Sequence, residues 1–410
     1  MSSTPNPLEA LADLRHEFGE HGGVNMSIEA STTFTVMEPG TIPEIFRGAK
    51  GPDSGGCYLY GRHFNPTVYN LGRQLAALEG TESAYCTASG MGAIAAAVLQ
   101  PCSEGDHIVA SNTIYGGTYA LFEEFLPAKA GINTTLVDIN DLKAVRDALT
   151  ANTRILYTET LSNPTLRVSD ISALAKLAHE HGALLVVDNT FTPLVASPAQ
   201  LGADVVVHSM TKFISGTSDI IAGAVCSTNE FVQGLMDLHT GPLMLLGPTM
   251  DPNTAFALSM RIPHLGLRIT EHSRRALVMA QRLESLGLKV IYPGLPEHQD
   301  HGLAEALFRS EFGFGGVLAL DVGAEDLANE LMERLQNHYG FGYMAVSLGY
   351  FDTLMSCSGS STSSEMTESD KQQAGISPGL IRISVGYTGT LEQRWQQLHA
   401  ALKEVGLVRF

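Results

Sequence analysis

The sequence of 410 residues is poor in cysteine, in basic side chains and in long apolar runs. Its five cysteines are an odd number without a CxxC pair, which argues against a disulfide framework or a zinc ribbon and indicates a reducing compartment. Because 43 acidic residues outweigh 25 basic ones, the net charge is −18, and we expect no nucleic acid, membrane or metal partner. The N-terminus has no apolar signal segment, and no run reaches the roughly 18 apolar residues of a membrane span. We therefore expect a cytoplasmic protein.

Periodicity divides the chain into an arm and two folded parts. Residues 1–60 carry little periodicity and many Gly, Pro and Thr residues, so we expect an irregular arm that lies on another surface. From about Pro66, apolar β-branched segments alternate with amphipathic helical ones, which predicts an α/β domain with a mostly parallel sheet covered on both faces. A long helical stretch, Asn253–Leu286, then precedes a smaller α+β pattern. We place the arm at 1–62 and the domains at 63–260 and 261–410.

The same patterns predict the individual elements. In the large domain we expect strands at His107–Ala110, Thr134–Asp138, Arg154–Glu159, Ala183–Asp188, Asp204–His208 and Ala222–Ser227, and helices at Gly116–Leu126, Asp141–Leu149 and Ser169–His181. In the small domain we expect strands at Lys289–Tyr292, Val317–Asp321 and Leu380–Val385, and helices at Leu327–Leu335 and Leu391–Val405.

One of the eight lysines, Lys212, directly follows a buried strand and precedes Gly-rich sequence. Chemistry in an open α/β sheet gathers at the carboxyl ends of the strands, so this position is typical of a reactive lysine. Partial desolvation there would lower the pKa of the amine and make it a nucleophile toward aldehydes. A surface lysine at a strand end is the alternative, and Lys212 taken alone leaves that alternative open.

The neighbours of Lys212 favour a reactive lysine. Asp188 closes the strand that lies one strand–helix–strand step earlier, and its carboxylate could keep a pyridine nitrogen protonated. The Gly-rich segment 87–93 opens a helix, where free backbone N–H groups suit a phosphate. Further hydroxyl, guanidinium and aromatic candidates for phosphate and ring binding are Ser209, Thr211, Tyr60, Arg62 and Tyr115. Together these groups specify pyridoxal 5′-phosphate.

Eight motifs resemble those of the Cys/Met-metabolism family of pyridoxal-phosphate enzymes, which has the aspartate aminotransferase-like fold type I. In chain order they are YGRHFNPT (Tyr60–Thr67), ASGMGA (Ala88–Ala93), YGGT (Tyr115–Thr118), NPTL (Asn163–Leu166), VVDNTF (Val186–Phe191), HSMTKFISG (His208–Gly216), VSLG (Val346–Gly349) and IRISVG (Ile381–Gly386). Their order and spacing match over residues 55–405. The arm and the segment after VSLG are most similar to plant-type methionine γ-lyases and their bacterial relatives.

The resemblance implies a role for each matching residue around the cofactor. Lys212 would carry pyridoxal phosphate as an aldimine and shuttle protons, and Asp188 would pair with the pyridine nitrogen. Tyr115 would stack on the ring and assist departure of the leaving group. Groups of the same subunit would hold the phosphate, namely Gly90, Met91, Ser209 and Thr211. Two side chains of the neighbouring subunit would complete the phosphate site, namely Tyr60 and Arg62.

The resemblance also implies a substrate site and an assembly. The carboxylate of an amino-acid substrate would bind Arg382, with help from Ser347 and Asn163. Family members are usually homotetramers, built from dimers that share their active sites. Gly117 stands where bacterial and protozoal members carry a cysteine, which leaves the substrate range open. The Ser-rich composition of Ser356–Ser364 favours either a flexible linker or a loop near the active-site mouth.

Two apolar positions bear on the choice of substrate. Family members that act on cystathionine tend to carry glutamates where this sequence has Leu59 and Val346. Apolar side chains there suit a thioether methyl and would leave a distal ammonium unpaired. We therefore expect a carbon–sulfur lyase that converts L-methionine to methanethiol, 2-oxobutanoate and ammonia. The alternatives are an O-acyl-homoserine sulfhydrylase or cystathionine γ-synthase-like replacement enzyme, and a cofactor-binding regulator without turnover.

Overall fold

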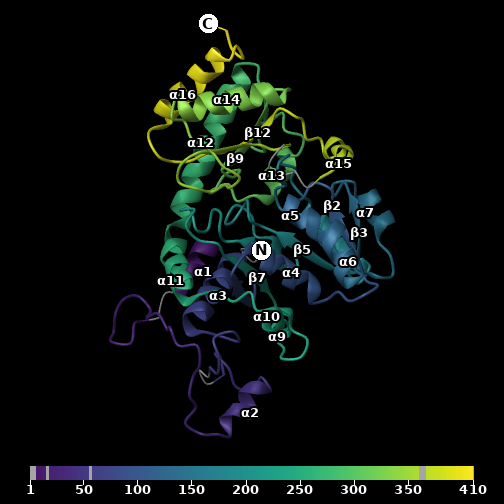
Figure 1. Cartoon of the computed structure of the whole chain (residues 1–410), viewed down its shortest axis with the longest axis vertical. Helices are drawn as coiled ribbons and strands as arrows, with labels where there is room; N and C mark the ends of the chain where they lie inside the picture. The colour runs from purple at the N-terminus through teal and green to yellow at the C-terminus, as the bar shows by residue number, and fades with distance from the viewer. Residues whose placement is uncertain (1–5, 15–17, 55–57, 360–365, 410) are drawn as a thin grey trace.

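The computed structural model describes residues 6–14, 18–54, 58–359 and 366–409. In this part of the chain two β-sheets, each beside its own hydrophobic core, form the two lobes seen in Figure 1. The long helix α12, Leu265–Ser285, connects the lobes, because Leu265 belongs to the first core and Leu283 to the second. The domain limits at residues 62 and 260 stay a prediction.

Among the described residues the larger sheet has seven strands in the order β1-β7-β6-β5-β4-β2-β3. They are β1 Ser83–Thr87, β2 His107–Ser111, β3 Asn133–Val137, β4 Thr153–Glu159, β5 Leu184–Asp188, β6 Val205–Ser209 and β7 Gly223–Ser227. Strands β2 to β6 pair in parallel, and β7 runs antiparallel to both of its neighbours. This arrangement confirms the predicted mostly parallel sheet.

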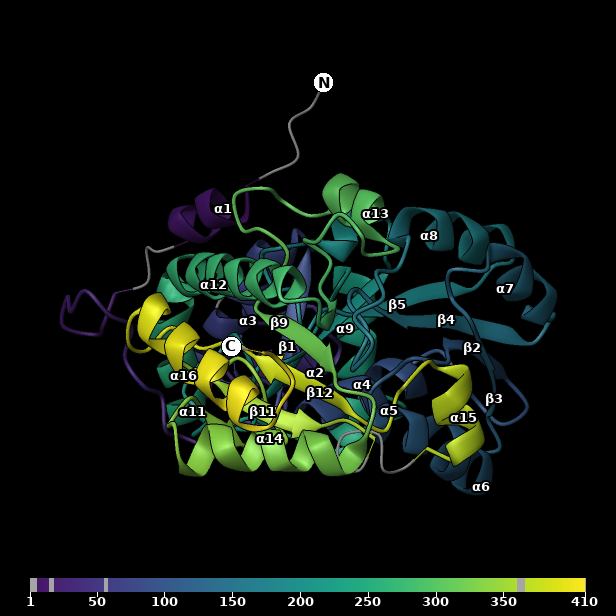
Figure 2. The same ribbon diagram turned by 90° about the horizontal axis from the view of Figure 1, so that it is seen from above.

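Helices cover both faces of this sheet, which explains why its strands read as continuous apolar runs. Figure 2 shows α7 and α8 on one side of strands β2 to β5, and α5 and α6 on the other. The helices of this lobe are α3 Pro66–Glu79, α4 Gly90–Leu99, α5 Gly116–Ala120, α6 Leu126–Ala130, α7 Leu142–Ala148, α8 Ile171–Glu180, α9 Asn229–Leu235 and α10 Pro242–Leu246. A π-helical turn, Leu121–Phe125, joins α5 to α6.

The smaller sheet has five strands within the described ranges, in the order β10-β11-β12-β9-β8. They are β8 Lys289–Ile291, β9 Val317–Asp321, β10 Tyr343–Met344, β11 Leu354–Cys357 and β12 Leu380–Ser384. The remaining helices are α11 Pro252–Arg261, α13 His301–Leu307, α14 Glu325–Asn337, α15 Glu368–Gln373 and α16 Leu391–Glu404. The expected long helical stretch is divided into α11 and α12 by a short turn at Ile262–His264, because Pro263 cannot donate a backbone hydrogen bond.

Ser356 and Cys357 belong to β11 and are buried, so the prediction of a loop or linker is wrong for these two residues. Cys357 belongs to the second core, and β11 pairs antiparallel with β12, with Ser356 opposite Arg382. Composition alone missed the strand because serine is common in loops. Residues 360–364 of the same segment lie outside the described residues. No helix within the described ranges is long and apolar enough to cross a membrane.

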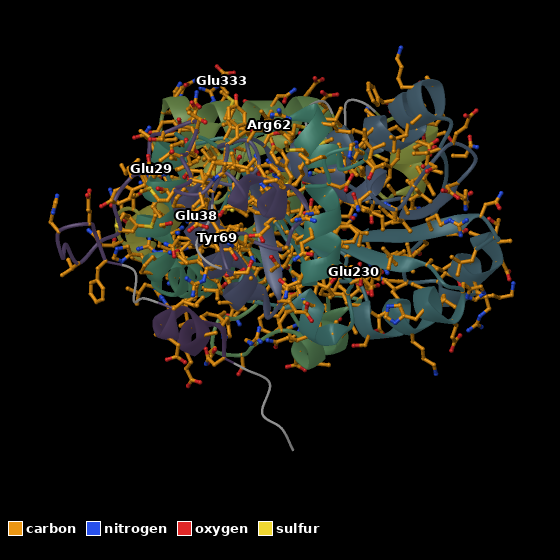
Figure 3. The ribbon with its side chains drawn as sticks, turned by 90° about the horizontal axis from the view of Figure 1, so that it is seen from below. Glu29, Glu38, Arg62, Tyr69, Glu230 and Glu333 are labelled. Carbon is orange, nitrogen blue, oxygen red and sulfur yellow. The ribbon has the colours of Figure 1, made fainter. Side chains whose placement is uncertain are left out.

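In the described residues of the N-terminal arm, two short helices, α1 Pro7–Asp13 and α2 Thr41–Phe46, interrupt largely irregular chain. Figure 1 shows α2 standing away from the rest of the molecule. The arm is joined to α3, since Tyr69 donates a hydrogen bond to Asp53 and the Glu29 N–H donates to Thr67 Oγ1 at 2.9 Å. Figure 3 shows this face from below, with Glu29 and Tyr69 labelled.

Candidate active site

A cavity of about 240 Å³ lies at the carboxyl ends of β4, β5 and β6. The position follows from the topology, because parallel strands bring their last residues to one edge of the sheet. The cavity brings together most of the predicted site residues, namely Gly90, Met91, Tyr115, Asn163, Asp188, Ser209, Thr211, Lys212, Val346 and Arg382. Ser347 is not in the lining but accepts a hydrogen bond from Lys212, which is, and the lining does not include Leu59, Tyr60 or Arg62.

Lys212 sits in a short turn after β6 and is partly buried. Its Nζ donates a hydrogen bond to Ser347 Oγ at 3.1 Å. Burial lowers the pKa of the amine to about 8, and the nearby cation of Arg382 contributes in the same direction. Roughly a tenth of such an amine is therefore uncharged at pH 7, and the uncharged form is the one that attacks a carbonyl carbon.

Asp188 ends β5 and is 8% exposed. One carboxylate oxygen accepts the Thr190 N–H at 2.9 Å, and burial raises the pKa of the carboxyl above its ordinary value. A buried carboxylate gains most from a cationic hydrogen-bond donor, and a protonated pyridine nitrogen is such a donor. The environment of Asp188 therefore fits the ring of pyridoxal phosphate.

The first turn of α4 meets the end of β6 and forms a cradle of backbone N–H and hydroxyl groups. Ser89 Oγ caps α4 by accepting the Gly92 N–H at 3.0 Å. A Cβ at Gly90 would lie 2.7 Å from Ser209 Cβ, so only glycine allows this approach. The N–H groups at the start of a helix and the nearby hydroxyls of Ser209 and Thr211 suit a phosphate.

Arg382 lies on β12 and is 3% exposed, so its charge is buried. Its Nη1 donates to Asn163 Oδ1 at 3.1 Å and its Nη2 to the Ser347 carbonyl at 3.0 Å. Its Nε is buried without a hydrogen-bond partner among the described residues. Burial lowers the pKa of the guanidinium to about 10, so it stays charged at neutral pH. Arg382 therefore has the charge and the free donor that an anionic ligand such as a carboxylate would satisfy.

Glu159 also lines the cavity, and sequence reasoning did not select it. It ends β4, is 5% exposed and accepts the Tyr115 N–H at 2.7 Å. The sequence could have indicated Glu159 as a site residue, because it ends a buried strand in the same way as Asp188 ends the next one. Tyr115 itself begins α5, and its ring covers Gly117, where a Cβ would lie 2.6 Å from Tyr115 Cε1.

The residues at the mouth of the cavity include two exposed apolar side chains. Ile221 and Val346 line the cavity and are 71% and 68% exposed. Leu161 and Leu348 lie deeper in the same lining and are buried. Among the described residues that line the cavity, the cations are Lys212 and Arg382. An apolar group on an amino-acid ligand would therefore contact apolar side chains at the mouth of the cavity.

Tyr60 and Arg62 are the predicted phosphate ligands that the single chain does not bring to the cavity. Arg62 Nη1 donates to the Met244 carbonyl on α10, and its guanidinium lies 5.7 Å from the centroid of the Tyr60 ring. Leu59 belongs to the same arm segment. The role of all three residues in a neighbouring subunit's site stays a prediction.

A second cavity, of about 270 Å³, lies between α1, α3 and α11. Its described lining is mostly apolar and holds no titratable side chain, so it offers no acid, base or amine for catalysis. Within the described ranges no group of three or more His, Cys, Asp or Glu side chains is placed to hold a metal ion.

The fold and the main cavity together define a fold type I pyridoxal-phosphate enzyme. A crystal structure from Campylobacter jejuni, of a protein described as an O-acetylhomoserine (thiol)-lyase, has the same fold with a TM-score of 0.89 at 27% identity. The match covers 97% of this chain and 100% of that one, and that structure contains N′-pyridoxyl-lysine-5′-monophosphate. The lysine, carboxylate and phosphate cradle described above fit the same cofactor.

A family model for Cys/Met metabolism PLP-dependent enzymes matches residues 10–403, and the chain belongs to this family. Methionine gamma-lyase from Arabidopsis thaliana is 60% identical over 397 residues, which are 97% of this chain and 90% of the relative. O-succinylhomoserine sulfhydrylase from Pseudomonas aeruginosa is 38% identical over 332 residues, 80% of this chain and 79% of that relative. These findings confirm the predicted family and its cofactor, pyridoxal 5′-phosphate.

Proposed function

We propose that the protein is a carbon–sulfur lyase that converts L-methionine and water to methanethiol, 2-oxobutanoate and ammonia. The observation that carries this proposal is the apolar mouth formed by Ile221 and Val346, in the cavity that holds Lys212 and Arg382. A thioether methyl can lie against that mouth without losing a polar partner. The identity of 60% to the Arabidopsis methionine gamma-lyase supports the same choice.

Different residues of the cavity act on different parts of the substrate. Arg382 binds the substrate carboxylate, and Asn163 and Ser347 hold the guanidinium in place. Lys212 removes the proton from Cα, since its amine is partly uncharged near neutral pH. When bound, pyridoxal phosphate provides an electron sink for the negative charge that develops at Cα. Tyr115 assists departure of the thiolate.

The phosphate site needs residues from a second subunit. The cradle of Gly90, Met91, Ser209 and Thr211 supplies N–H and hydroxyl groups, and a dianion binds more tightly when a guanidinium joins them. We infer that Arg62 and Tyr60 of the neighbouring subunit complete the cradle, and that two such dimers form a homotetramer. The buried thiols of Cys86, Cys102 and Cys226, none of them in a disulfide, support a location in the reducing cytoplasm.

The proposal is tested by comparing two reactions of the purified enzyme loaded with cofactor. In the first, methionine is the only substrate and 2-oxobutanoate and methanethiol are measured. In the second, O-acetylhomoserine is supplied together with sulfide, and homocysteine is measured. We expect product in the first reaction at a higher kcat/KM than in the second. If 2-oxobutanoate does not accumulate from methionine while homocysteine forms, the protein is a sulfhydrylase, the activity of its Pseudomonas relative.

A further inference from the structure

Glu159 is hydrogen-bonded to two different loops of the active site. It ends β4 directly opposite Asp188 on β5, and its side chain is buried. One oxygen, Oε1, accepts the Tyr115 N–H at 2.7 Å, at the start of α5. The other oxygen, Oε2, accepts the Asn163 N–H at 2.9 Å, in the turn after β4. Each oxygen of one carboxylate therefore holds a separate loop.

Each of these loops carries a group that faces the cavity. Tyr115 presents its ring, and Asn163 Oδ1 accepts a hydrogen bond from Arg382 Nη1 at 3.1 Å. The two loops are far apart in the sequence, since Tyr115 precedes Glu159 by 44 positions and Asn163 follows it by 4. Glu159 thus connects the loop of the aromatic ring with the loop that orients the buried guanidinium.

Placing a carboxylate at this position costs free energy. Burial raises the pKa of the Glu159 carboxyl well above its usual range, and the adjacent carboxylate of Asp188 acts in the same direction. Lys212 and Arg382 are the cations in the described lining of the same cavity. A side chain needed only to fill the end of β4 would be apolar, because an apolar group avoids the desolvation and the like-charge repulsion.

We propose that Glu159 is a positioning residue that fixes the Tyr115 ring and the Arg382 guanidinium relative to each other. The roles of those two residues rest on the proposed function, but the contacts of Glu159 do not. The ring determines how the cofactor is held, and the guanidinium determines where the substrate carboxylate is held. A change at Glu159 must therefore affect cofactor binding and substrate binding together, whereas a change in either loop alone would affect one of them.

The test uses Glu159→Gln, which keeps the size of the side chain. A glutamine accepts one backbone N–H through its carbonyl oxygen, but its amide nitrogen faces the other N–H and leaves it unpaired. We expect the Kd for pyridoxal phosphate and the KM for methionine both to rise, because the unpaired N–H shifts the side chain that the two loops share, and the larger rise to be about tenfold, the effect of one buried unpaired donor. The visible circular dichroism of the bound cofactor should weaken, because the ring is held less rigidly. Thr153→Val is the control, since Thr153 is buried at the opposite end of the same strand and its Oγ1 bonds His107 and Thr150.

A double-mutant cycle shows whether the effect passes through Asn163. In an Asn163→Ala background the side chain that holds Arg382 is already gone, so Glu159→Gln should raise KM no further. Unchanged cofactor Kd and KM in Glu159→Gln, or fully additive effects on KM, would overturn the inference. If Glu159→Gln does not fold, Glu159→Asp takes its place. It keeps the charge but is too short to reach both loops, so we expect the same shifts, and their absence overturns the inference.

The test of Glu159 can fail or succeed independently of the test of the proposed lyase activity. A wild-type enzyme that forms no 2-oxobutanoate from methionine would contradict the lyase. The cofactor Kd and the circular dichroism of Glu159→Gln would then still test whether Glu159 positions Tyr115, because neither measurement needs a substrate.

Discussion

Lys212 Nζ donates a hydrogen bond to Ser347 Oγ at 3.1 Å, although 135 positions separate the two residues in the chain. The main chain around Ser347 packs tightly on Lys212, since a Cβ at Gly349 would lie 2.8 Å from the Lys212 carbonyl carbon. Gly349 also has a φ of +75°, which disfavours any residue with a side chain. The Ser347 carbonyl accepts Arg382 Nη2 at 3.0 Å, so one segment holds both the amine and the guanidinium.

Replacing Lys212 by alanine should abolish turnover. The variant loses the amine that binds the cofactor covalently and moves the substrate proton, and we expect kcat to fall by a factor of about 10³ or more. The measurement is 2-oxobutanoate formation from methionine, with a visible spectrum that reports covalent capture of the cofactor. Lys176→Ala, at an exposed position on α8, should behave as wild type. A Lys212→Ala enzyme with near-normal rate would refute the assignment.

The lowered pKa of Lys212 predicts a specific pH dependence of cofactor capture. Only the uncharged amine attacks the aldehyde, so capture by the cofactor-free protein should speed up as the pH rises and be half-maximal near pH 8. An ordinary lysine would show its midpoint near pH 10.5. The measurement is the rate of the absorbance change after mixing with pyridoxal phosphate. In Arg382→Met the midpoint should move to higher pH, because the removed cation no longer disfavours the charged amine.

Mixing two defective subunits should restore activity if Arg62 acts on the neighbouring site. Arg62→Ala should weaken cofactor retention, and Lys212→Ala should be inactive. A mixed dimer then has one site with both defects and one intact site, so reassembled equal mixtures should reach about a quarter of the wild-type activity at limiting cofactor. Arg47→Ala, another arginine of the arm, should retain cofactor as wild type does. If the mixtures gain nothing over the separate variants, Arg62 does not act across the interface.

Gly117→Ala should lower activity without lowering stability. The added methyl would lie 2.6 Å from Tyr115 Cε1, so the ring must shift away from its place at the cavity. We expect kcat/KM to fall about tenfold, within the range that misplacing a contact group produces. The free energy of unfolding should rise slightly, because alanine is a better helix former than glycine within α5. Equal activity in the variant would mean that the position of this ring is not critical.

The buried Glu79 should contribute strongly to stability. Its Oε1 accepts hydrogen bonds from His208 Nε2 at 2.7 Å and from Asn189 Nδ2 at 2.9 Å, the residues that flank Ser209 and Asp188 in sequence. Glu79→Ala should lower the free energy of unfolding by about 3–5 kcal/mol, because the donors lose their partner inside the protein. Urea unfolding measures this loss. Glu82→Ala, on the exposed side of the same region, should cost less than about 1 kcal/mol, and equal losses would contradict the prediction.

The strands of the large sheet were predictable because helices bury both of their faces. That burial favours continuous apolar runs such as Leu184–Val187, which are recognisable between helical segments. The polar residues that end these runs, Asp188 and Ser209, could be selected as site candidates for the same reason. Glu159 ends β4 in the same way and could have been selected too, but it carries no motif of its own, and its role is visible only in the two hydrogen bonds that it accepts in the fold.

The amino-acid sequence by itself determined the α/β order of elements, the reactive lysine at a strand end and the family, because each depends on residues that are near one another in the chain. Only the tertiary structure decided which distant groups meet at that lysine. The contact of Lys212 with Ser347, the hold of Glu159 on two loops and the absence of Arg62 from its own chain's cavity all depend on packing between segments. No local pattern records such packing, since it arises from how the two cores and the sheet edge fit together in space.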